Sequence, residues 1–323
     1  MTIRIPFLLN WYANPYHAPI FVAKEMDYFE QEGDINLAIL EPTDPSDVTE
    51  LVGTGRADMG LKAMIHTIAG RVRGFQIKAI GMLLDEPPTG ILYSNNKKSE
   101  NNNDTNIISN IQDLKGKRVG YVGEFGKYIL NDLLKRNAVN PATDDVYTVR
   151  VGMKVPDALT AGTIDAGIGL GNCQLIEMEN MILNGSNGTT KTVGFLKFDE
   201  SIGIHCCFCS VLYIANEEFL KENLELVQGF MRAIKKGTDF IHQKPDQAFE
   251  ILCNALPRLK KDEKTNRKIF YASLPYVSKD LVTIEKDWYE VKEYMEHLKL
   301  VDASSFDINQ CYTNSLVPTE AIA

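Results

Sequence analysis

The chain has 323 residues, 44% of them hydrophobic and 24% charged, which is the profile of a globular enzyme or binding protein with room for two cores. Its formal net charge is −9, and no Lys/Arg block is present that could follow a phosphate backbone, so nucleic acid is a poor candidate ligand. No apolar run approaches the roughly 18–20 residues that a membrane helix needs, which argues against membrane insertion.

The first residues and the cysteines indicate the compartment. The N-terminus lacks the basic start, apolar stretch and cleavage site of a secretory signal, and the alternation of Ile3, Ile5 and Phe7 predicts a strand instead. Three of the six cysteines stand so close together, at positions 206, 207 and 209, that they are poor disulfide partners for one another. Both features predict a cytoplasmic protein with reduced thiols.

The N-terminal third alternates segments of strand and helix character. Strands are predicted at 4–11, 35–42, 57–61 and 76–84, and helices at 17–33, 45–55 and 61–72. Successive βαβ units of this kind imply a parallel sheet with helices on both of its faces.

The rest of the chain divides at two polar segments. Segments 94–110 and 184–192 have no apolar period and are predicted to be loops. Between and after them we expect a strand at 117–122, a helix at 127–134, a strand at 210–216 and long helices from there to about Tyr294. We expect residues 1–95 with 205–323 to form lobe I, including the C-terminal helices, and residues 96–204 to form lobe II.

A repeated pattern indicates that the two lobes are related. Segments 51–61 and 159–168 each end a helix, turn at a glycine and enter an apolar strand through Asp-x-Gly. Gly55 and Gly162 suit the left-handed conformation that often ends a helix. Duplicated α/β lobes bind ligands at the carboxyl ends of their strands, so we expect a ligand cleft between the lobes.

Lys62 and His66 are the first candidates for chemistry. They are four positions apart and are expected on one face of the helix predicted at 61–72. In a first helical turn, the helix dipole lowers the pKa of a lysine, and a deprotonated amine is what Schiff-base chemistry requires. The alternative is a solvated helix face that carries a lysine and a histidine.

A glycine-rich stretch from Gly120 to Lys127 follows the strand predicted at 117–122 and opens the next helix. Glycines let backbone N–H groups approach an anion, and the helix N-terminus adds partial positive charge. The stretch is a candidate cradle for a phosphate or carboxylate, with an ordinary tight turn as the alternative.

The string His205, Cys206, Cys207, Phe208, Cys209 directly precedes a predicted strand. If that strand begins early, His205, Cys207 and Cys209 face one way and the other two residues face the opposite way. One histidine and two thiolates on one side suit a transition metal such as iron or zinc. Buried cysteines that only fill the core are the alternative.

Asn10, Trp11 and Tyr16 lie where the first strand gives way to the first helix. The ring of Trp11 or Tyr16 can stack on a flat heterocycle and Asn10 can hydrogen-bond to it, although such residues are as often packing residues. Residues 85–88, which end the strand predicted at 76–84, are candidates to line the same opening.

Together these motifs resemble the 4-amino-5-hydroxymethyl-2-methylpyrimidine phosphate (HMP-P) synthases of thiamine biosynthesis, within the periplasmic-binding-protein type II-like (thiamine pyrimidine synthase/SsuA-like) superfamily. The resemblance spans Ile5 to about Lys236 and rests on FLLNW, LEPTDPSDVTELVGTGRADMGLKAMIH, LLDEPPTG, KGKRVGYVGEFGK, IDAGIG and CCFC. It implies an α/β, two-lobed periplasmic-binding-protein type II-like fold, with mostly parallel sheets flanked by helices, and a homodimer.

The resemblance also implies an unusual reaction. Pyridoxal 5′-phosphate is the substrate, held as an aldimine on Lys62, and His66 is consumed to build the pyrimidine, so each chain of this transferase-type enzyme turns over once. Iron and oxygen are required. The phosphate loop of the family corresponds to Gly123, Glu124, Phe125 and Gly126.

The iron-binding cysteine motif of the family corresponds to residues 205–209, with His205, Cys206, Cys207 and Cys209 as candidate ligands. His205 stands where the family has a cysteine, and histidine is also an iron ligand. Two other functions stay open: a transport-type binding protein for a pyrimidine or thiamine precursor, and a protein that binds pyridoxal phosphate without chemistry. Neither explains why Lys62, His66 and the cysteines occur together.

Overall fold

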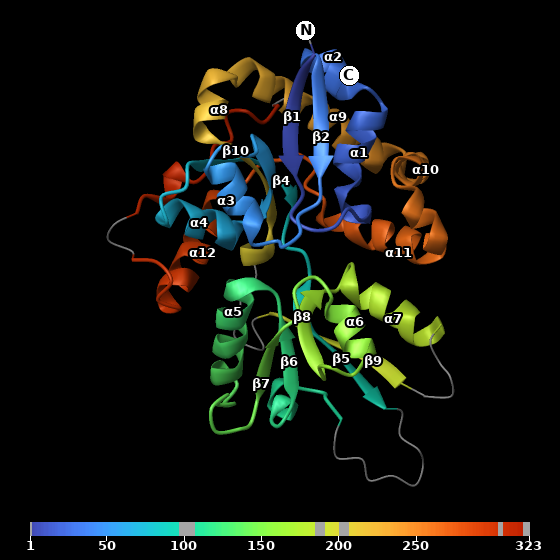
Figure 1. Cartoon of the computed structure of the whole chain (residues 1–323), viewed down its shortest axis with the longest axis vertical. Helices are drawn as coiled ribbons and strands as arrows, with labels where there is room; N and C mark the ends of the chain where they lie inside the picture. The colour runs from blue at the N-terminus through green and yellow to red at the C-terminus, as the bar shows by residue number, and fades with distance from the viewer. Residues whose placement is uncertain (1, 97–106, 185–190, 200–206, 303–305, 319–323) are drawn as a thin grey trace. The chain divides into compact units, whose positions relative to one another are not determined.

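The structure is a computed structural model, and it describes residues 2–96, 107–184, 191–199, 207–302 and 306–318 (Figure 1). The chain forms two compact units, one made of Met1–Glu86 with Cys207–Ala323 (unit 1) and one made of Pro87–Cys206 (unit 2). Residues 87–95, expected in lobe I, therefore belong to unit 2. Among the described residues, no helix is long and apolar enough to cross a bilayer.

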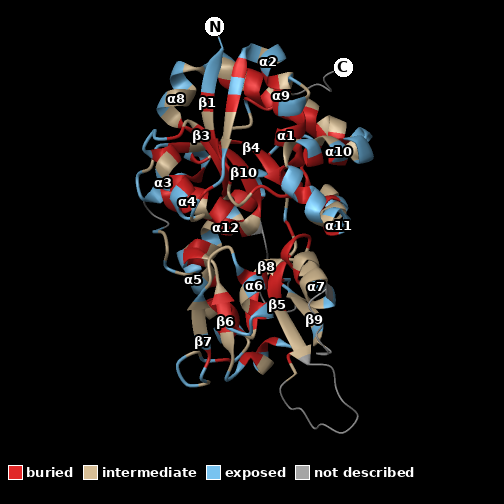
Figure 2. Cartoon of the chain, turned by 45° about the vertical axis from the view of Figure 1, so that its right-hand side comes forward, coloured by how far each residue is buried: buried red, intermediate tan, exposed pale blue. Residues whose placement is uncertain are grey.

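Unit 1 is built around a five-stranded sheet of order β2-β1-β3-β10-β4. The strands are β1 (Ile3–Leu8), β2 (Ile35–Leu40), β3 (Met59–Ala63), β4 (Ile77–Leu84) and β10 (Val211–Asn216). β1 is parallel to β2 and β3, whereas β10 is antiparallel to β3 and β4. Strands β3, β4 and β10 are almost entirely buried, as Figure 2 shows, because helices cover the sheet.

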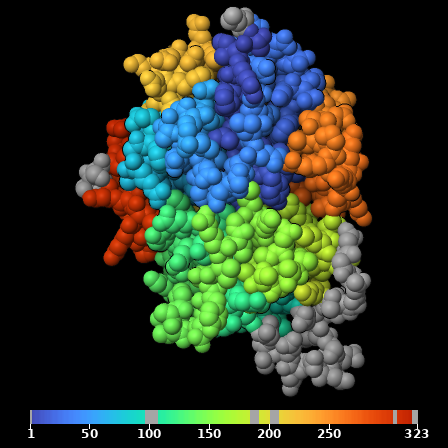
Figure 3. Space-filling view, in the orientation of Figure 1, coloured from blue at the N-terminus to red at the C-terminus, as the bar shows by residue number. Residues whose placement is uncertain are grey.

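The helices of unit 1 come from both ends of the chain. They are α1 (Ala18–Glu25), α2 (Tyr28–Gly33), α3 (Asp47–Gly53), α4 (Met64–Val72), α8 (Glu217–Glu222), α9 (Leu224–Gln243), α10 (Pro245–Ala255), α11 (Glu263–Ser273) and α12 (Glu285–His297). Helices α9 and α10 pack against α1, so segments far apart in the sequence lie side by side; the blue and orange surfaces of Figure 3 adjoin for this reason. The buried aromatic rings of Phe7, Tyr213 and Phe230 form the centre of this core.

The single helix predicted at 17–33 is wrong. α1 ends at Glu25 and α2 begins at Tyr28, because Asp27 between them has φ 56°, a left-handed conformation that a helix interior excludes. The stretch before α1 is a short 3₁₀ helix, η1 (Pro15–His17), capped by the side chain of Asn14.

Unit 2 has a five-stranded sheet of order β7-β6-β8-β5-β9. Its elements are β5 (Thr89–Asn96), η2 (Ile111–Leu114), β6 (Arg118–Tyr121), α5 (Gly123–Arg136), β7 (Tyr147–Arg150), α6 (Val155–Thr160), β8 (Ala166–Leu170), α7 (Gln174–Asn184) and β9 (Lys191–Lys197). β6 is parallel to β7 and β8, and β5 is antiparallel to β8 and β9. The predicted loop at 94–110 is partly wrong, because residues 94–96 extend β5; residues 97–106 lie outside the described part.

The two sheets have the same design, in which three parallel strands are followed by one antiparallel strand and a last strand paired to it. The repeated glycine turn supports this, since Gly55 and Gly162 have φ 72° and 69°. Gly60 and Gly167 also pair with equivalent neighbours, Leu8 and Gly120. The predicted duplication is confirmed.

Candidate functional site

Most candidate side chains of unit 1 lie at one edge of its sheet. Since β1 and β3 are parallel and β10 runs antiparallel between β3 and β4, the carboxyl ends of β1, β3 and β4 meet at the amino end of β10. Val211, the first residue of β10, pairs with Ala63 on one side and Leu84 on the other. Asn10 follows β1, Lys62 lies near the end of β3, and Asp85 follows β4. The fold thus gathers these residues as strand ends do in α/β proteins.

Lys62 belongs to strand β3 and not to a helix. Its backbone pairs with Leu212 of β10, and this pairing carries the strand two residues beyond its predicted end, so that helix α4 starts only at Met64. The prediction that Lys62 and His66 share one helix face is therefore wrong. The two residues still lie close along the chain, one in the strand and one in the first turn of the following helix.

Burial gives the amine of Lys62 its chemical character. The side chain is only 2% exposed, and its Nζ donates a hydrogen bond to the carbonyl oxygen of Pro45. Burial lowers the pKa of Lys62 to about 7, while the carboxylates of Asp44 and Asp47 oppose the shift. A large share of this amine is therefore unprotonated near neutral pH. The cause is desolvation rather than the predicted helix dipole.

His66 is half-buried in the first turn of α4. Burial lowers its pKa well below the usual value, and the positive charges of Lys62 and Arg73 act in the same direction. The imidazole is therefore neutral at physiological pH. A neutral ring next to a partly unprotonated amine is an arrangement suited to nucleophilic chemistry rather than to a solvated charged face.

Asn10 and Trp11 follow β1 and are half-buried. Asn10 donates a hydrogen bond from Nδ2 to Tyr16 Oη at 3.2 Å, and its Oδ1 lies 3.0 Å from His17 Nε2. The indole Nε1 of Trp11 is buried and has no hydrogen-bond partner among the described residues. Tyr16 is buried in the core, which leaves Trp11 as the better candidate for stacking on a ligand.

The glycine-rich stretch of unit 2 forms a helix start. Helix α5 begins at Gly123, four residues earlier than predicted, so Gly123, Glu124, Phe125 and Gly126 make up its first turn. Gly123 has φ 62°, which favours glycine, and no side chain caps the helix. The first N–H groups of a helix have no carbonyl partner within it and form a natural anion site.

The cysteine motif is described only in part. His205 and Cys206 lie outside the described residues, while Cys207 to Cys209 form a short 3₁₀ helix, η4. The strand begins later, at Val211, so the predicted alternation of side chains across a strand does not hold for residues 207–209. Cys209 is half-buried. The ring of Phe208 stacks on that of Tyr294, with 5.8 Å between the ring centroids. Within the described ranges, no three His, Cys, Asp or Glu side chains are grouped to hold a metal.

Two buried polar residues, His17 and Asp287, were given no role in the sequence analysis. His17 is fully buried against Asn10, and Asp287, in the first turn of α12, is 7% exposed with an Oδ2 that has no partner among the described residues. Burial raises the pKa of Asp287 to about 6, and the charges of Glu86 and Asp85 add to the shift. No local pattern marks Asp287, since it lies in an ordinary amphipathic helix and meets residues 85–86 only in the folded chain.

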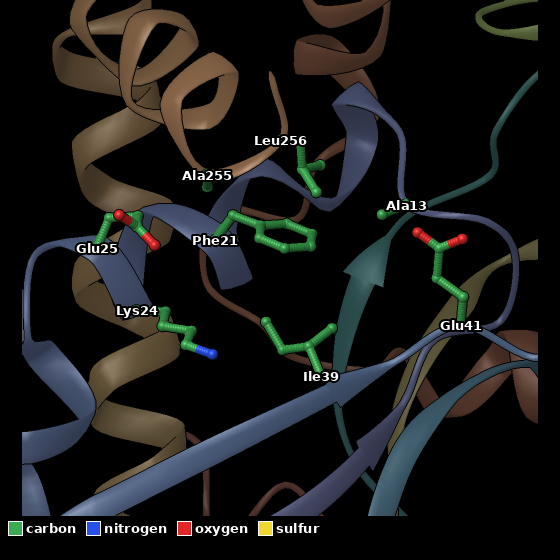
Figure 4. Close-up of a pocket in the computed structure, with 8 residues that line it drawn as sticks. All are labelled: Ala13, Phe21, Lys24, Glu25, Ile39, Glu41, Ala255 and Leu256. Atoms are coloured by element: carbon green, nitrogen blue, oxygen red, sulfur yellow. The ribbon is translucent and has the colours of Figure 1, made fainter. Parts of the chain in front are cut away.

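A surface pocket of about 190 Å³ lies elsewhere in unit 1 (Figure 4). Phe21 and Ile39 form its apolar part, and the charged side chains of Lys24, Glu25 and Glu41 surround it. None of the predicted site residues lines this pocket.

Comparisons with known proteins identify the family. The sequence profile of the family described as "NMT1/THI5 like" matches residues 14–248. The chain belongs to this family. It is 46% identical over 316 residues to the 4-amino-5-hydroxymethyl-2-methylpyrimidine phosphate synthase of Legionella pneumophila, covering 98% of this chain and 92% of that one. It is 44% identical to the synthase of the same name from Aspergillus parasiticus, covering 97% and 87% of the two chains.

Solved structures confirm the predicted fold class. The periplasmic aliphatic sulphonate binding protein SsuA of Escherichia coli superposes with a TM-score of 0.67 over 96% of this chain and 97% of that one. At 15% sequence identity, this likeness concerns the fold alone. This chain thus shares its architecture with a periplasmic binding protein.

Proposed function

We propose that the chain is an HMP-P synthase, like the relatives to which it is similar. It would build the thiamine pyrimidine from pyridoxal 5′-phosphate and its own His66. Family membership supports the overall reaction. The observation that carries the mechanism is a buried lysine of pKa about 7 followed, four residues on, by a neutral imidazole at the same sheet edge.

Lys62 fits a role as the residue that binds the aldehyde of the substrate. Pyridoxal 5′-phosphate, when bound, supplies ring atoms for the product and an aldehyde that reacts with primary amines. Only an unprotonated amine is nucleophilic, and the burial of Lys62 provides one without a neighbouring base. The carbonyl oxygen of Pro45 fixes the position of the amine.

His66 fits the role of the histidine that is consumed. Its low pKa keeps the imidazole ring in the neutral, electron-rich form. Attachment in the first turn of α4 holds the ring near the end of β3, and the charge of Lys62 acts on the pKa of His66, which supports a position of the two groups near each other. Holding two reacting groups in this way can supply several kcal/mol of a reaction barrier, to order of magnitude.

The remaining parts of the site are proposed on the same basis. The first turn of α5, Gly123 to Gly126, is proposed to bind the phosphate through backbone N–H groups, with Asn10 and Trp11 contacting the heterocycle. Iron is proposed to bind at residues 205–209, where Cys209 is the described, partly exposed candidate ligand. A cytoplasmic homodimer is proposed as the working form.

The experiment that tests this function counts product. The purified chain is mixed anaerobically with pyridoxal 5′-phosphate and ferrous iron, oxygen is admitted, and HMP-P is quantified by mass spectrometry. We expect no more than one HMP-P per chain, and none from His66→Gly, although this variant still binds pyridoxal 5′-phosphate. Product from the His66→Gly variant would contradict the proposal, as would several turnovers per chain.

The fold also favours a second candidate function, ligand binding without chemistry, because SsuA-like proteins of this architecture are named as binding proteins. In that case the wild-type chain would retain pyridoxal 5′-phosphate under the same conditions and release no HMP-P. The product measurement therefore separates the two functions in one assay.

A further inference from the structure

We infer that His17 is a positioning residue, which orients the amide of Asn10 for ligand binding through a single fixed tautomer. The inference rests on the proposed function insofar as the ligand is pyridoxal 5′-phosphate. It concerns a buried group that the reaction itself does not use, and it acts through Asn10 at the end of β1.

The backbone of η1 decides which ring nitrogen of His17 carries the proton. The N–H of Asn14 donates a hydrogen bond to His17 Nδ1 at 3.2 Å, so Nδ1 must be the unprotonated nitrogen. In a neutral imidazole the proton then resides on Nε2. This Nε2–H lies 3.0 Å from Asn10 Oδ1, to which it donates.

The environment keeps His17 neutral. The residue is 0% exposed, and burial lowers its pKa to about 3. The positive charge of Arg258 acts in the same direction. A charged ring would lose the Asn14 bond as well as its hydration, because both nitrogens would then be donors. The tautomer is therefore constant throughout the physiological pH range.

The fixed tautomer selects one of the two orientations of the Asn10 amide. With Oδ1 facing His17, Nδ2 donates to Tyr16 Oη at 3.2 Å. A flipped amide would turn its own N–H toward the Nε2–H of His17, and two donors would face each other without an acceptor between them. Asn14 holds this arrangement in place, since its side chain accepts from the Tyr16 N–H and donates to the Tyr12 carbonyl oxygen, both at 3.1 Å.

Asn10 is the only half-exposed member of this trio, because Tyr16 and His17 are buried. Its amide retains one N–H and one oxygen lone pair beyond the two bonds described. A heterocycle with an acceptor atom, such as a ring nitrogen or a phenolate oxygen, matches that N–H. His17 thus prevents the amide from rotating and presenting the wrong group to the ligand.

The first test reads the tautomer directly and needs no ligand. Two-bond ¹H–¹⁵N correlation spectra of the wild-type chain report which imidazole nitrogen is protonated. We expect one His17 signal set with the proton on Nε2 and no titration between pH 5 and pH 8. A proton on Nδ1, or a ring that titrates in this range, would overturn the inference.

The second test is a double-mutant cycle on pyridoxal 5′-phosphate affinity, with folding checked by circular dichroism. We expect Asn10→Ala and His17→Leu each to raise Kd about tenfold, and the double variant to be within about twofold of Asn10→Ala, since both changes remove the same oriented amide. Effects that multiply in the double variant would show that His17 acts independently of Asn10 and would overturn the inference.

His17→Gln is the conservative control, because a glutamine amide nitrogen can replace the Nε2–H donor. We expect its Kd to stay within about threefold of the wild-type value. If His17→Leu does not fold, His17→Gln is compared with Tyr16→Phe and Asn10→Ala, and a tenfold loss in His17→Gln overturns the inference. Wild-type protein that fails to bind pyridoxal 5′-phosphate overturns the proposed function as well, whereas normal wild-type binding with multiplying effects overturns the inference alone.

Discussion

The two sheets share one strand order, yet their equivalent positions carry different chemistry. In unit 1 the strand after the repeated glycine turn holds Lys62, which pairs with the antiparallel strand β10. In unit 2 the equivalent strand has Gly169, which pairs with the antiparallel strand β5. A Cβ at Gly169 would lie 2.5 Å from Leu92 Cδ1, so this position accepts no side chain without rearrangement. The two units share the strand order, and only unit 1 carries an amine at this position.

The carboxyl ends of the equivalent strands β1 and β6 differ as well. After β1, unit 1 presents the side chains of Asn10 and Trp11, whereas after β6, unit 2 begins a helix at Gly123 and presents backbone N–H groups. Side chains can react or stack, and backbone N–H groups can bind an anion. From this comparison we propose reaction chemistry in unit 1 and anion binding in unit 2, and both proposals are open to direct tests.

The largest expected effect is that of Lys62→Ala, which removes the amine from the unit 1 position. We expect covalent attachment of pyridoxal 5′-phosphate to fall by roughly 100-fold or more, because the variant lacks the buried amine that is proposed to react with the aldehyde. Borohydride reduction followed by peptide mass spectrometry measures the attachment. Lys62→Arg is the matched control that keeps a long cationic chain but no primary amine, and retained attachment in either variant would contradict the assignment.

Asp287→Asn tests the repulsion between the buried Asp287 carboxylate and the carboxylates of Asp85 and Glu86 in unit 1. The folded pKa of Asp287, about 6, lies above the unfolded value, so the unfolded chain binds fewer protons between about pH 4 and pH 6 and stability falls as pH rises through this window. Removing the charge is therefore expected to stabilise the chain at pH 7 by roughly 1–3 kcal/mol. Urea unfolding at pH 7 and at pH 4 measures this, and an equal difference at both values would contradict the electrostatic explanation.

Gly123→Ala tests the anion-binding assignment of unit 2. A side chain at φ 62° strains the start of α5, and we expect the affinity for pyridoxal 5′-phosphate to fall about tenfold. Gly152→Ala is the matched control, since Gly152 has φ 57° in the same unit with open space around it, and its cost is expected in stability alone. Calorimetric titration of both variants decides, and equal losses of affinity would remove the special role of Gly123.

The smallest effects are expected at the repeated turns themselves. Gly55→Ala and Gly162→Ala place a side chain in the left-handed conformation at equivalent helix ends, each at a cost of about 1 kcal/mol. Denaturant unfolding measures both costs. Values that differ severalfold would mean that the two turns are not equivalent, which would weaken the duplication on which the comparison depends.

Much of this molecule could be predicted from its sequence because local signals agreed with the final fold. Alternating strand and helix segments, two glycine turns and a set of candidate residues at strand ends all have short-range patterns. Asn10, Lys62 and His66 were chosen as candidates in this way, and all three lie at or just after strand ends at the carboxyl edge of the unit 1 sheet.

The errors arose where distant pairing decides local structure. Strand β3 includes Lys62 only because β10, from much later in the chain, pairs with it, and a helix pattern from Leu61 onward gave no hint of this. The pKa of Lys62 was expected to be low for the wrong reason, since burial rather than a helix dipole lowers it. Residues Cys207–Cys209 form the 3₁₀ helix η4 where an early start of the strand was considered. The proximity of the Asp287 carboxylate to those of Asp85 and Glu86 also has no sequence signature.

The central claim is that His66 supplies atoms to the product HMP-P. The mass of the peptide that contains His66 tests this claim most directly. The chain is loaded with pyridoxal 5′-phosphate and ferrous iron, and peptides are weighed before and after oxygen is admitted. The peptide with His297, an exposed histidine on α12, controls for general metal-catalysed oxidation. We predict a loss of mass at residue 66 in step with HMP-P formation and an unchanged His297 peptide. An intact His66 after HMP-P has formed would contradict the account.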